Sequence, residues 1–401
     1  MKSILALWAI VAAAPLMAQE DSIEANKDTL IFTTVVENPI TSIKNQNNSG
    51  TCWCYSSLAF LESEVLKKHP EMKDIDLCES FVVNKTYLDR ADRNIRTHGD
   101  ASFSQGGSFY DVIYCMTNYG LAPEGVMPYP ETLYGDSLYN FSSFFPPMEA
   151  YVEAISKSEA KRINPSWRNS VQGMLDDYFG KCPEQFEYEG KTYTPQSFVE
   201  FLGLNADDYV SLTSYTHHPF YQPFILEIQD NWRWASSYNL PLDEFMRVME
   251  EGIRNGYTFA WGADVSEEGF SRRKGKHLSV ATVPIPQKGP SVGSDQSRWT
   301  GEPQGAKISE SDQEGELEIT QELRQLGYDN WETTDDHGMQ IYGIAKDQNG
   351  KEYFMMKNSW GEMGPYKGLW YVSKPYVAYK TMNILINKNA VPKDIRKKLG
   401  I

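Results

Sequence analysis

The spacing of apolar residues changes along the chain, and this change restricts the possible folds more than any other feature. Before about residue 255 apolar side chains recur at helical spacing, as in residues 242–253. After Gly256 the apolar runs are short and alternating, as β-strands require, at residues 257–260, 341–345 and 353–357. Helices that come first and strands that come last predict an α+β fold, with a helical half, a β half and a cleft between them.

Composition shows that the chain can bury a large core and excludes several classes of partner. Of 401 residues, 41% are hydrophobic and 13% aromatic, which is far more burial capacity than a disordered chain carries. The formal net charge of −16 disfavours binding to nucleic acid or to an anionic membrane, because such contacts need clustered Lys and Arg. We therefore expect no nucleic-acid partner and no membrane contact in the mature chain.

The first eighteen residues have the pattern of a cleaved secretory signal. Lys2 supplies a positive start, residues 4–15 form a short apolar run, and Ala18 offers a small residue before Gln19. The apolar run is shorter than the roughly 20 residues that a membrane-spanning helix needs. The sequence thus predicts an exported protein, periplasmic or extracellular, whose mature part is one unit over residues 19–401.

A polar turn over residues 45–51 runs into a helical pattern that begins at Cys52 and ends at Lys68. The unpaired amides and the positive dipole end at the start of a helix favour a thiolate, so Cys52 is a candidate nucleophile. Gln46 brings a side-chain amide close to the Cys52 backbone N–H, and two such donors can form an oxyanion hole. Gly50 has the conformational freedom to turn a further backbone N–H toward the same point.

His337 is the candidate base, because it stands where a polar stretch enters an alternating strand. Asn349-Gly350 is a hairpin signal between this strand and the next, which puts His337 and Asn358 near the same end of a β-ribbon. Asn358 can orient the imidazole while Trp360 shields it from water, giving a nucleophile, a base and an orienter. The other histidines lie beside proline, charged or turn residues and are interpreted as solvent-exposed: His69, His98, His217, His218 and His277.

Together, Gln46, Cys52-Trp53, Asp336-His337 and the Asn-Ser-Trp-Gly run at residues 358–361 resemble the papain-like cysteine peptidases. His337 follows Cys52 by 285 residues, against roughly 130–150 in the small members. The chain is most similar to the bleomycin hydrolase and aminopeptidase C branch, which carries a large helical insertion. The resemblance implies a nucleophile-bearing helical half at about 40–130, a helical insertion at 131–255, a β half at 256–401, and no metal or cofactor.

The same resemblance predicts the substrate contacts and the mode of cleavage. It implies that Gly106 and Gly107 pair with the substrate backbone and that Trp53, Trp360 and Asp336 line the site. The branch commonly forms hexameric rings, so a homo-oligomer acting on peptides or proteins is expected. In that branch a C-terminal arm enforces aminopeptidase action. Here the arm looks shortened, which leaves endopeptidase action open beside aminopeptidase action. Residues 284–315 form a long polar loop.

Other functions fit parts of the sequence less well. A thiol-disulfide oxidoreductase using Cys52 and Cys54 leaves the motifs around His337 and Asn358 unexplained. A catalytically silent peptide-binding protein on the same scaffold would not need all four chemical positions. A zinc site is weaker, because the Cys-x-Cys has no matching second pair and the adjacent His217 and His218 are expected to point in different directions. The remaining cysteines are interpreted as buried apolar side chains, with disulfide pairing left open: Cys78, Cys115 and Cys182.

Overall fold

The computed structural model describes residues 30–127, 138–267, 269–270, 279–284 and 315–401. The chain divides into a unit over Met1–Ile31 and a unit over Phe32–Ile401, and every helix and strand below belongs to the second. The predicted signal segment, His277 and nearly all of the polar loop lie outside the described residues. Among the residues that are described, no helix combines the length and apolar character needed to cross a bilayer.

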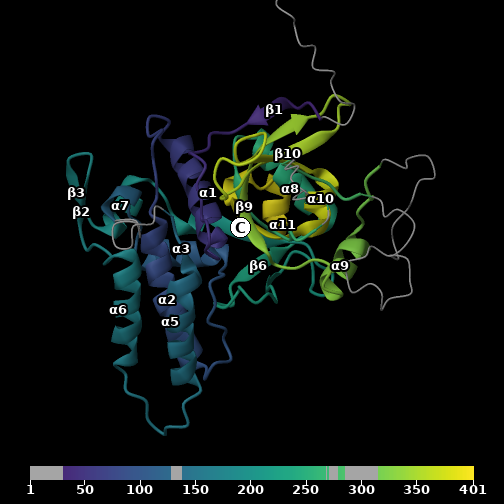
Figure 1. Cartoon of the computed structure of the whole chain (residues 1–401). Helices are drawn as coiled ribbons and strands as arrows, with labels where there is room; N and C mark the ends of the chain where they lie inside the picture. The colour runs from purple at the N-terminus through teal and green to yellow at the C-terminus, as the bar shows by residue number, and fades with distance from the viewer. Residues whose placement is uncertain (1–29, 128–137, 268, 271–278, 285–314) are drawn as a thin grey trace, which may run out of the picture. The chain divides into compact units, whose positions relative to one another are not determined.

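In the described part of the helical half, five helices pack together (Figure 1). They are α1 (Cys52–Lys68), α2 (Glu79–Arg96), α3 (Phe109–Asn118), α5 (Phe141–Ser156) and α6 (Trp167–Phe179). The helix predicted from Cys52 to Lys68 is confirmed. Every residue of α1 from Trp53 to Leu66 is buried, so this helix lies inside the protein rather than on its surface. Its first residue is thereby held by packing on several sides.

The β half is built on one ten-stranded sheet with the order β5-β6-β4-β12-β7-β9-β10-β11-β8, and β1 pairs with β9. Its later strands are β7 (Phe259–Ala263), β8 (Val280–Ala281), β9 (His337–Lys346), β10 (Glu352–Lys357), β11 (Leu369–Ser373) and β12 (Thr381–Asn387), with β1 at Thr33–Glu37. The accompanying helices are α8 (Leu242–Arg254), α9 (Gln321–Asp329), α10 (Lys374–Lys380) and α11 (Lys393–Leu399). The predicted α+β content is confirmed, and α8 buries Phe245, Val248 and Met249 as its spacing indicated.

The segment predicted as a helical insertion at residues 131–255 contains strands as well as helices. Besides α5, α6, α7 (Pro195–Phe201) and α8, its described residues form five strands. They are β2 (Phe186–Tyr188), β3 (Lys191–Tyr193), β4 (Tyr209–Thr213), β5 (Pro223–Ile225) and β6 (Ser236–Asn239). Each has three to five residues, which is too short for alternation to be recognised. The central strand β4 is anchored by β12, where Leu212 pairs with Ile384.

The predicted hairpin between β9 and β10 is confirmed. The two strands are antiparallel, and Gly350 in the turn adopts the left-handed conformation, with φ +84°. Lys357, the last residue of β10, pairs with Gln340 near the start of β9. His337 and Asn358 therefore emerge at the same end of the ribbon.

The start of β9 packs directly on the first turn of α1. A Cβ atom added to Gly338 would lie 2.7 Å from Ser56 Oγ and 3.2 Å from the Cys52 carbonyl oxygen. Two residues on, the buried Gln340 amide donates to Ala59 O at 3.0 Å and to Ser63 Oγ at 2.7 Å. A glycine at 338 lets the strand approach the helix closely enough to bring residue 337 beside residue 52.

We predict that Gly338→Ala destabilises the protein by about 1–3 kcal/mol, because the added methyl group forces α1 and β9 apart. The midpoint of urea unfolding measures this. Gly173→Ala is the matched control, since the same addition at this exposed position of α6 meets nothing within 4 Å. That control should be neutral or stabilising by roughly 1 kcal/mol. An unchanged midpoint for Gly338→Ala would contradict the close contact.

Candidate active site

Cys52 opens α1, and its thiol lies in a largely enclosed position. Burial raises the pKa of the Cys52 thiol to about 12, although the backbone N–H groups of Gly338 and Trp53 act in the opposite direction. The carboxylates of Asp335 and Asp230 raise this pKa further. The helix start favours a thiolate, but burial and these two carboxylates act against it. A thiolate here needs a cation beside it.

His337 is held in one orientation and one tautomer. Its Nε2 lies 2.8 Å from Asn358 Oδ1, and the same oxygen accepts a hydrogen bond from the Ser359 backbone N–H at 2.8 Å. Because Oδ1 acts as an acceptor toward Ser359, His337 Nε2 must carry the proton that it shares with Asn358, which leaves Nδ1 as the basic nitrogen. The Trp360 ring stacks on the imidazole with centroids 4.7 Å apart. The expected contacts of Asn358 and Trp360 with the histidine are confirmed.

Gln46 is buried and its amide has a fixed orientation. Its Oε1 accepts from Ser359 Oγ at 2.6 Å, while its Nε2 donates to Ser49 O at 2.8 Å. The backbone N–H of Gln46 also donates to Ser359 O at 2.8 Å. No described residue accepts from the second N–H of this amide nitrogen. The side chain is therefore held as a hydrogen-bond donor, which is what an oxyanion hole requires.

The backbone N–H of Gly50 makes a different contact from the one predicted. Its N–H donates to Gln105 Oε1 at 2.8 Å, so it is already engaged and is not aimed at an oxyanion. A Cβ at this position would lie 2.7 Å from Gln105 Cβ. The glycine at 50 thus permits the segment before Gly106 to pack against the turn that leads into α1.

The two glycines predicted to bind substrate lie against fixed side chains. Gly107 rests on Trp53, whose indole carbons would be 2.9 Å from an added Cβ. Trp53 is only 2% exposed and donates from Nε1 to Gln105 O at 3.1 Å, so it supports this segment from inside the protein. At Gly106 the carbonyl accepts from the buried Arg90 guanidinium. Substrate contacts by Gly106, Gly107 and Trp53 stay predictions.

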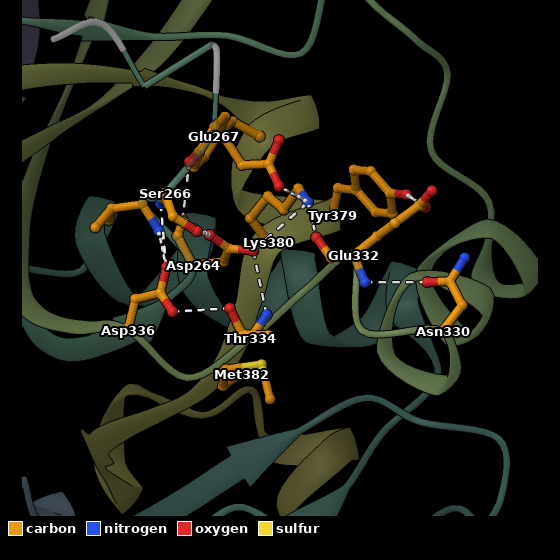
Figure 2. A network of polar contacts seen from close by, with 12 residues as sticks. Asp264, Ser266, Glu267, Asn330, Glu332, Thr334, Asp336, Tyr379, Lys380 and Met382 are labelled. Carbon is orange, nitrogen blue, oxygen red and sulfur yellow. Dashed lines mark hydrogen bonds and ion pairs between the residues drawn. The ribbon is translucent and has the colours of Figure 1, made fainter. Parts of the chain in front are cut away.

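Asp336 takes part in a polar network on the strand side of the site, shown in Figure 2. Its carboxylate accepts from the backbone N–H groups of Val265 at 3.3 Å and Ser266 at 3.1 Å, and from Thr334 Oγ1 at 2.7 Å. Burial and the nearby Asp336 raise the pKa of Asp264 to about 7. The hydrogen bond with Asp264 lowers the pKa of Asp336. These bonds anchor the residue before His337, and substrate contact by Asp336 stays a prediction.

Comparison with known proteins identifies the family to which this site belongs. The model of the Peptidase C1-like family matches residues 3–144 and 314–400. The chain belongs to the Peptidase C1-like family. It is 22% identical to Aminopeptidase G of Lactobacillus delbrueckii subsp. lactis, over 94% of this chain and 87% of that protein. It is also 22% identical to Aminopeptidase C of Lactobacillus helveticus, over 88% of this chain and 81% of that protein.

The fold of this Peptidase C1-like chain is also seen in a solved structure. The PepW protein of Lactobacillus rhamnosis HN001 superposes with a TM-score of 0.64 at 18% identity, covering 92% of this chain and 84% of PepW. The predicted papain-like fold and the resemblance to the aminopeptidase C branch are confirmed. The chain is a cysteine peptidase.

The remaining cysteines of the peptidase offer no partner to Cys52. All five cysteines lie in the described residues and carry free thiols. The Cys54 sulfur points to Glu79 O on α2, at 4.0 Å, and residues two apart on a helix do not face each other. Burial raises the pKa of Cys54 well above its usual value. The Cys-x-Cys sequence is therefore not arranged as a dithiol, which removes the main support for an oxidoreductase.

His217 and His218 point to one carboxylate, which corrects the expectation that they diverge. Their Nε2 atoms lie 3.2 Å and 2.9 Å from the two oxygens of Glu227, and the three ligand atoms fall within 4.8 Å of one another. Gln325 Oε1 accepts from the Thr216 N–H, so the Gln325 amide nitrogen must donate to His217 Nδ1. His217 Nε2 then carries the proton and donates to Glu227. The group is held as a hydrogen-bonded pair of rings, without a free nitrogen lone pair on His217 for a metal.

Two residues of the site were missed by sequence reasoning. Ser359 lies inside the Asn-Ser-Trp-Gly run, and its place beside Asn358 was the only available signal. Asp230 lies in a loop between short strands, and no motif marks it. Ser359 contacts both Asn358 and Gln46, so it links the residue that bonds to His337 with the Gln46 amide.

We predict that Ser359→Ala lowers kcat on the order of tenfold with little change in KM, because Gln46 loses the bond that fixes its amide. Removing an oxyanion donor outright costs more, roughly 10²–10³-fold. Steady-state kinetics on a peptide substrate measures the effect. Ser359→Thr keeps a hydroxyl and should retain most of the rate. A loss confined to KM, or an equal loss in both variants, would show that the bond to Gln46 does not matter.

Proposed function

We propose that this peptidase cleaves peptide bonds by covalent catalysis, with Cys52 as nucleophile, His337 as acid and base, Asn358 as orienter and Gln46 in the oxyanion hole. The observation that carries the proposal is the bond of 2.8 Å from His337 Nε2 to Asn358 Oδ1. It leaves Nδ1 as the basic nitrogen of a ring that immediately precedes Gly338. Gly338 packs on the Cys52 carbonyl. This contact holds the residue that precedes Gly338, the base His337, beside the residue that carries the thiol.

In the proposed reaction the thiol proton moves to His337 Nδ1, giving a thiolate beside an imidazolium. The sulfur attacks the carbonyl carbon of the peptide bond, and the resulting oxyanion accepts hydrogen bonds from Gln46 Nε2 and the Cys52 backbone N–H. The imidazolium protonates the leaving amine as the C–N bond breaks, which forms a thioester. His337 then removes a proton from water, the hydroxide attacks the thioester, and the thiol is restored as the acid product leaves.

The mode of cleavage that we propose is removal of N-terminal residues. The names of the relatives, Aminopeptidase G and Aminopeptidase C, support this choice. Endopeptidase action is the other mode that the sequence left open, and no observation among the described residues favours it. The substrates would be peptides or proteins with a free amino terminus.

Three further expectations from the sequence are kept as proposals. They are export to the periplasm or the extracellular space, assembly into a homo-oligomer, and the lack of nucleic-acid or membrane partners. The residues of the expected signal lie outside the described part of the chain.

We predict that an epoxysuccinyl inhibitor labels the protein at one site, Cys52, and abolishes peptide hydrolysis. Cys52→Ala should lose labelling and lower kcat by a factor on the order of 10⁴ or more, because no other group can form the thioester. Intact-mass spectrometry and peptide hydrolysis measure the two effects. Cys54→Ala is the matched control and should keep both properties. Full labelling of Cys52→Ala would refute the proposed nucleophile.

A further inference from the structure

Asp230 places a carboxylate directly over the glycine segment of the site. A Cβ atom added to Gly106 would lie 2.0 Å from Asp230 Oδ2 and 2.5 Å from Oδ1. No side chain other than hydrogen therefore fits at residue 106 while Asp230 stays in place. The adjacent Gly107 rests on Trp53, the residue after Cys52. The carboxylate thus lies one residue along a segment that packs on the start of α1.

The loop that carries Asp230 is fixed on both sides of this residue. Asn231 Nδ2 donates to two carbonyls of its own loop, at 3.0 Å and 2.9 Å. Trp232 Nε1 donates to Asp111 Oδ2 at 3.0 Å, and Arg233 Nε donates to Asp111 Oδ1 at 2.6 Å. Asp111 is fully buried at the start of α3. The position of Asp230 is therefore built into the protein and is not that of an acid on a loose surface loop.

Asp230 retains capacity for a second cation. Within the described part of the chain, Asp230 forms one ion pair, with Arg90, whose Nη2 lies 3.6 Å from Oδ1. Arg90 donates shorter hydrogen bonds to other acceptors, namely Ser102 O and Ser102 Oγ at 2.9 Å each, and Gly106 O. A carboxylate has about four acceptor positions. With 28% of its side chain exposed, Asp230 can offer the remaining positions to a ligand.

The charge around Asp230 favours a positively charged ligand near the nucleophile. Asp230 and Asp335 both raise the pKa of Cys52, so both carboxylates act on the sulfur. Burial, together with Asp230 and Asp336, raises the pKa of Asp335 to about 8. Against these acids Arg90 supplies one positive charge. A bound cation would partly neutralise the negative charge of Asp230 near the sulfur.

We propose that Asp230 accepts the α-ammonium group of the substrate, and that this contact makes the enzyme select free amino termini. The proposal rests on the function proposed above and adds the residue that determines specificity. With the acyl carbon at Cys52, the amino end of the bound residue extends toward the Gly106–Gly107 segment and meets the carboxylate. A substrate whose amino terminus is acylated, or extended by further residues, would place an uncharged amide there. The Asp230 carboxylate would then lose contact with water without gaining a positively charged partner, which weakens binding.

The test compares an aminoacyl-aminomethylcoumarin with its N-acetyl derivative, using the full chain. Wild type should prefer the free amine. Asp230→Asn keeps the shape and removes the charge, so kcat/KM for the free amine should fall on the order of 10- to 100-fold, mainly through KM. The N-acetyl substrate should be cleaved no less well than by wild type. Glu227→Gln, three residues earlier in the same loop, is the matched control and should leave the preference unchanged.

A second arm uses wild type alone, so that a folding defect in Asp230→Asn cannot hide the answer. The α-ammonium loses its proton with a pKa of about 7.7–8.0. The ratio of free-amine to N-acetyl cleavage should therefore fall as the pH rises through 8, and taking the ratio cancels the titration of Cys52 and His337, which act on both substrates alike. The charged and titratable groups that influence the pKa of Asp230, or whose pKa it influences, lie on α1, α2 and α3 and in the segment just before β9. They are Cys52, Tyr87, Arg90, Asp111 and Asp335.

The outcomes separate this inference from the proposed function. An equal loss on both substrates in Asp230→Asn, an unchanged preference, or a ratio in wild type that does not depend on pH would overturn the role of Asp230. Each of these leaves the catalytic proposal standing as long as Cys52→Ala is inactive. Activity in Cys52→Ala would instead overturn the proposed function itself.

Discussion

The close contact between Gly338 and the first turn of α1 is the constraint on which the site depends. Cys52 and His337, the proposed nucleophile and base, are 285 residues apart in the sequence, and they come from different halves of the fold. Only hydrogen fits on the Cα of residue 338, so the strand can lie against the Cys52 carbonyl. The buried Gln340 amide then fastens β9 to α1 through Ala59 and Ser63. The same contact that joins the halves thereby brings residue 337 to residue 52.

The end of β10 organises the rest of the site. Asn358 orients the imidazole, and Ser359 fixes the Gln46 amide. The residue before them, Lys357, is buried and donates to Thr41 Oγ1 at 2.8 Å, and Thr41 in turn bonds to Glu62 of α1. Burial lowers the pKa of Lys357 and raises the pKa of Glu62, and each is partly offset by the charge of the other. This buried network ties β10 to α1 beneath the groups that would do the chemistry.

Motifs with short-range consequences could be predicted from the sequence, whereas contacts made by tertiary packing could not. The helix at Cys52, the hairpin at Gly350 and the pairing of His337 with Asn358 follow from periodicity and turn chemistry over a few residues. The strands between Phe186 and Asn239 were missed because each is too short to show alternation. Asp230 was missed because the hydrogen bonds that position its loop join Trp232 and Arg233 to Asp111 of α3. No sequence pattern indicates these long-range bonds.

The pKa of Cys52, the proposed nucleophile, shows why position on a helix was an incomplete argument. The dipole and amides at the start of α1 favour a thiolate, but burial and the carboxylates of Asp230 and Asp335 outweigh them. Binding a substrate ammonium at Asp230 would reduce the negative charge acting on the sulfur. In the absence of substrate, the group that can stabilise the Cys52 thiolate is a positively charged His337. The orientation of that ring therefore matters for the reactivity of the thiol.

The most direct test of this account is the pH dependence of Cys52 alkylation by iodoacetamide, in wild type and in His337→Gln, followed on the Cys52 peptide by mass spectrometry. If the thiolate exists only as an ion pair, wild type should react rapidly below pH 7. His337→Gln should react only well above pH 8.5, where a free cysteine ionises, because burial raises the pKa of this thiol to about 12. Rapid alkylation of His337→Gln below pH 7 would contradict the account, because the helix start would then suffice to form the thiolate.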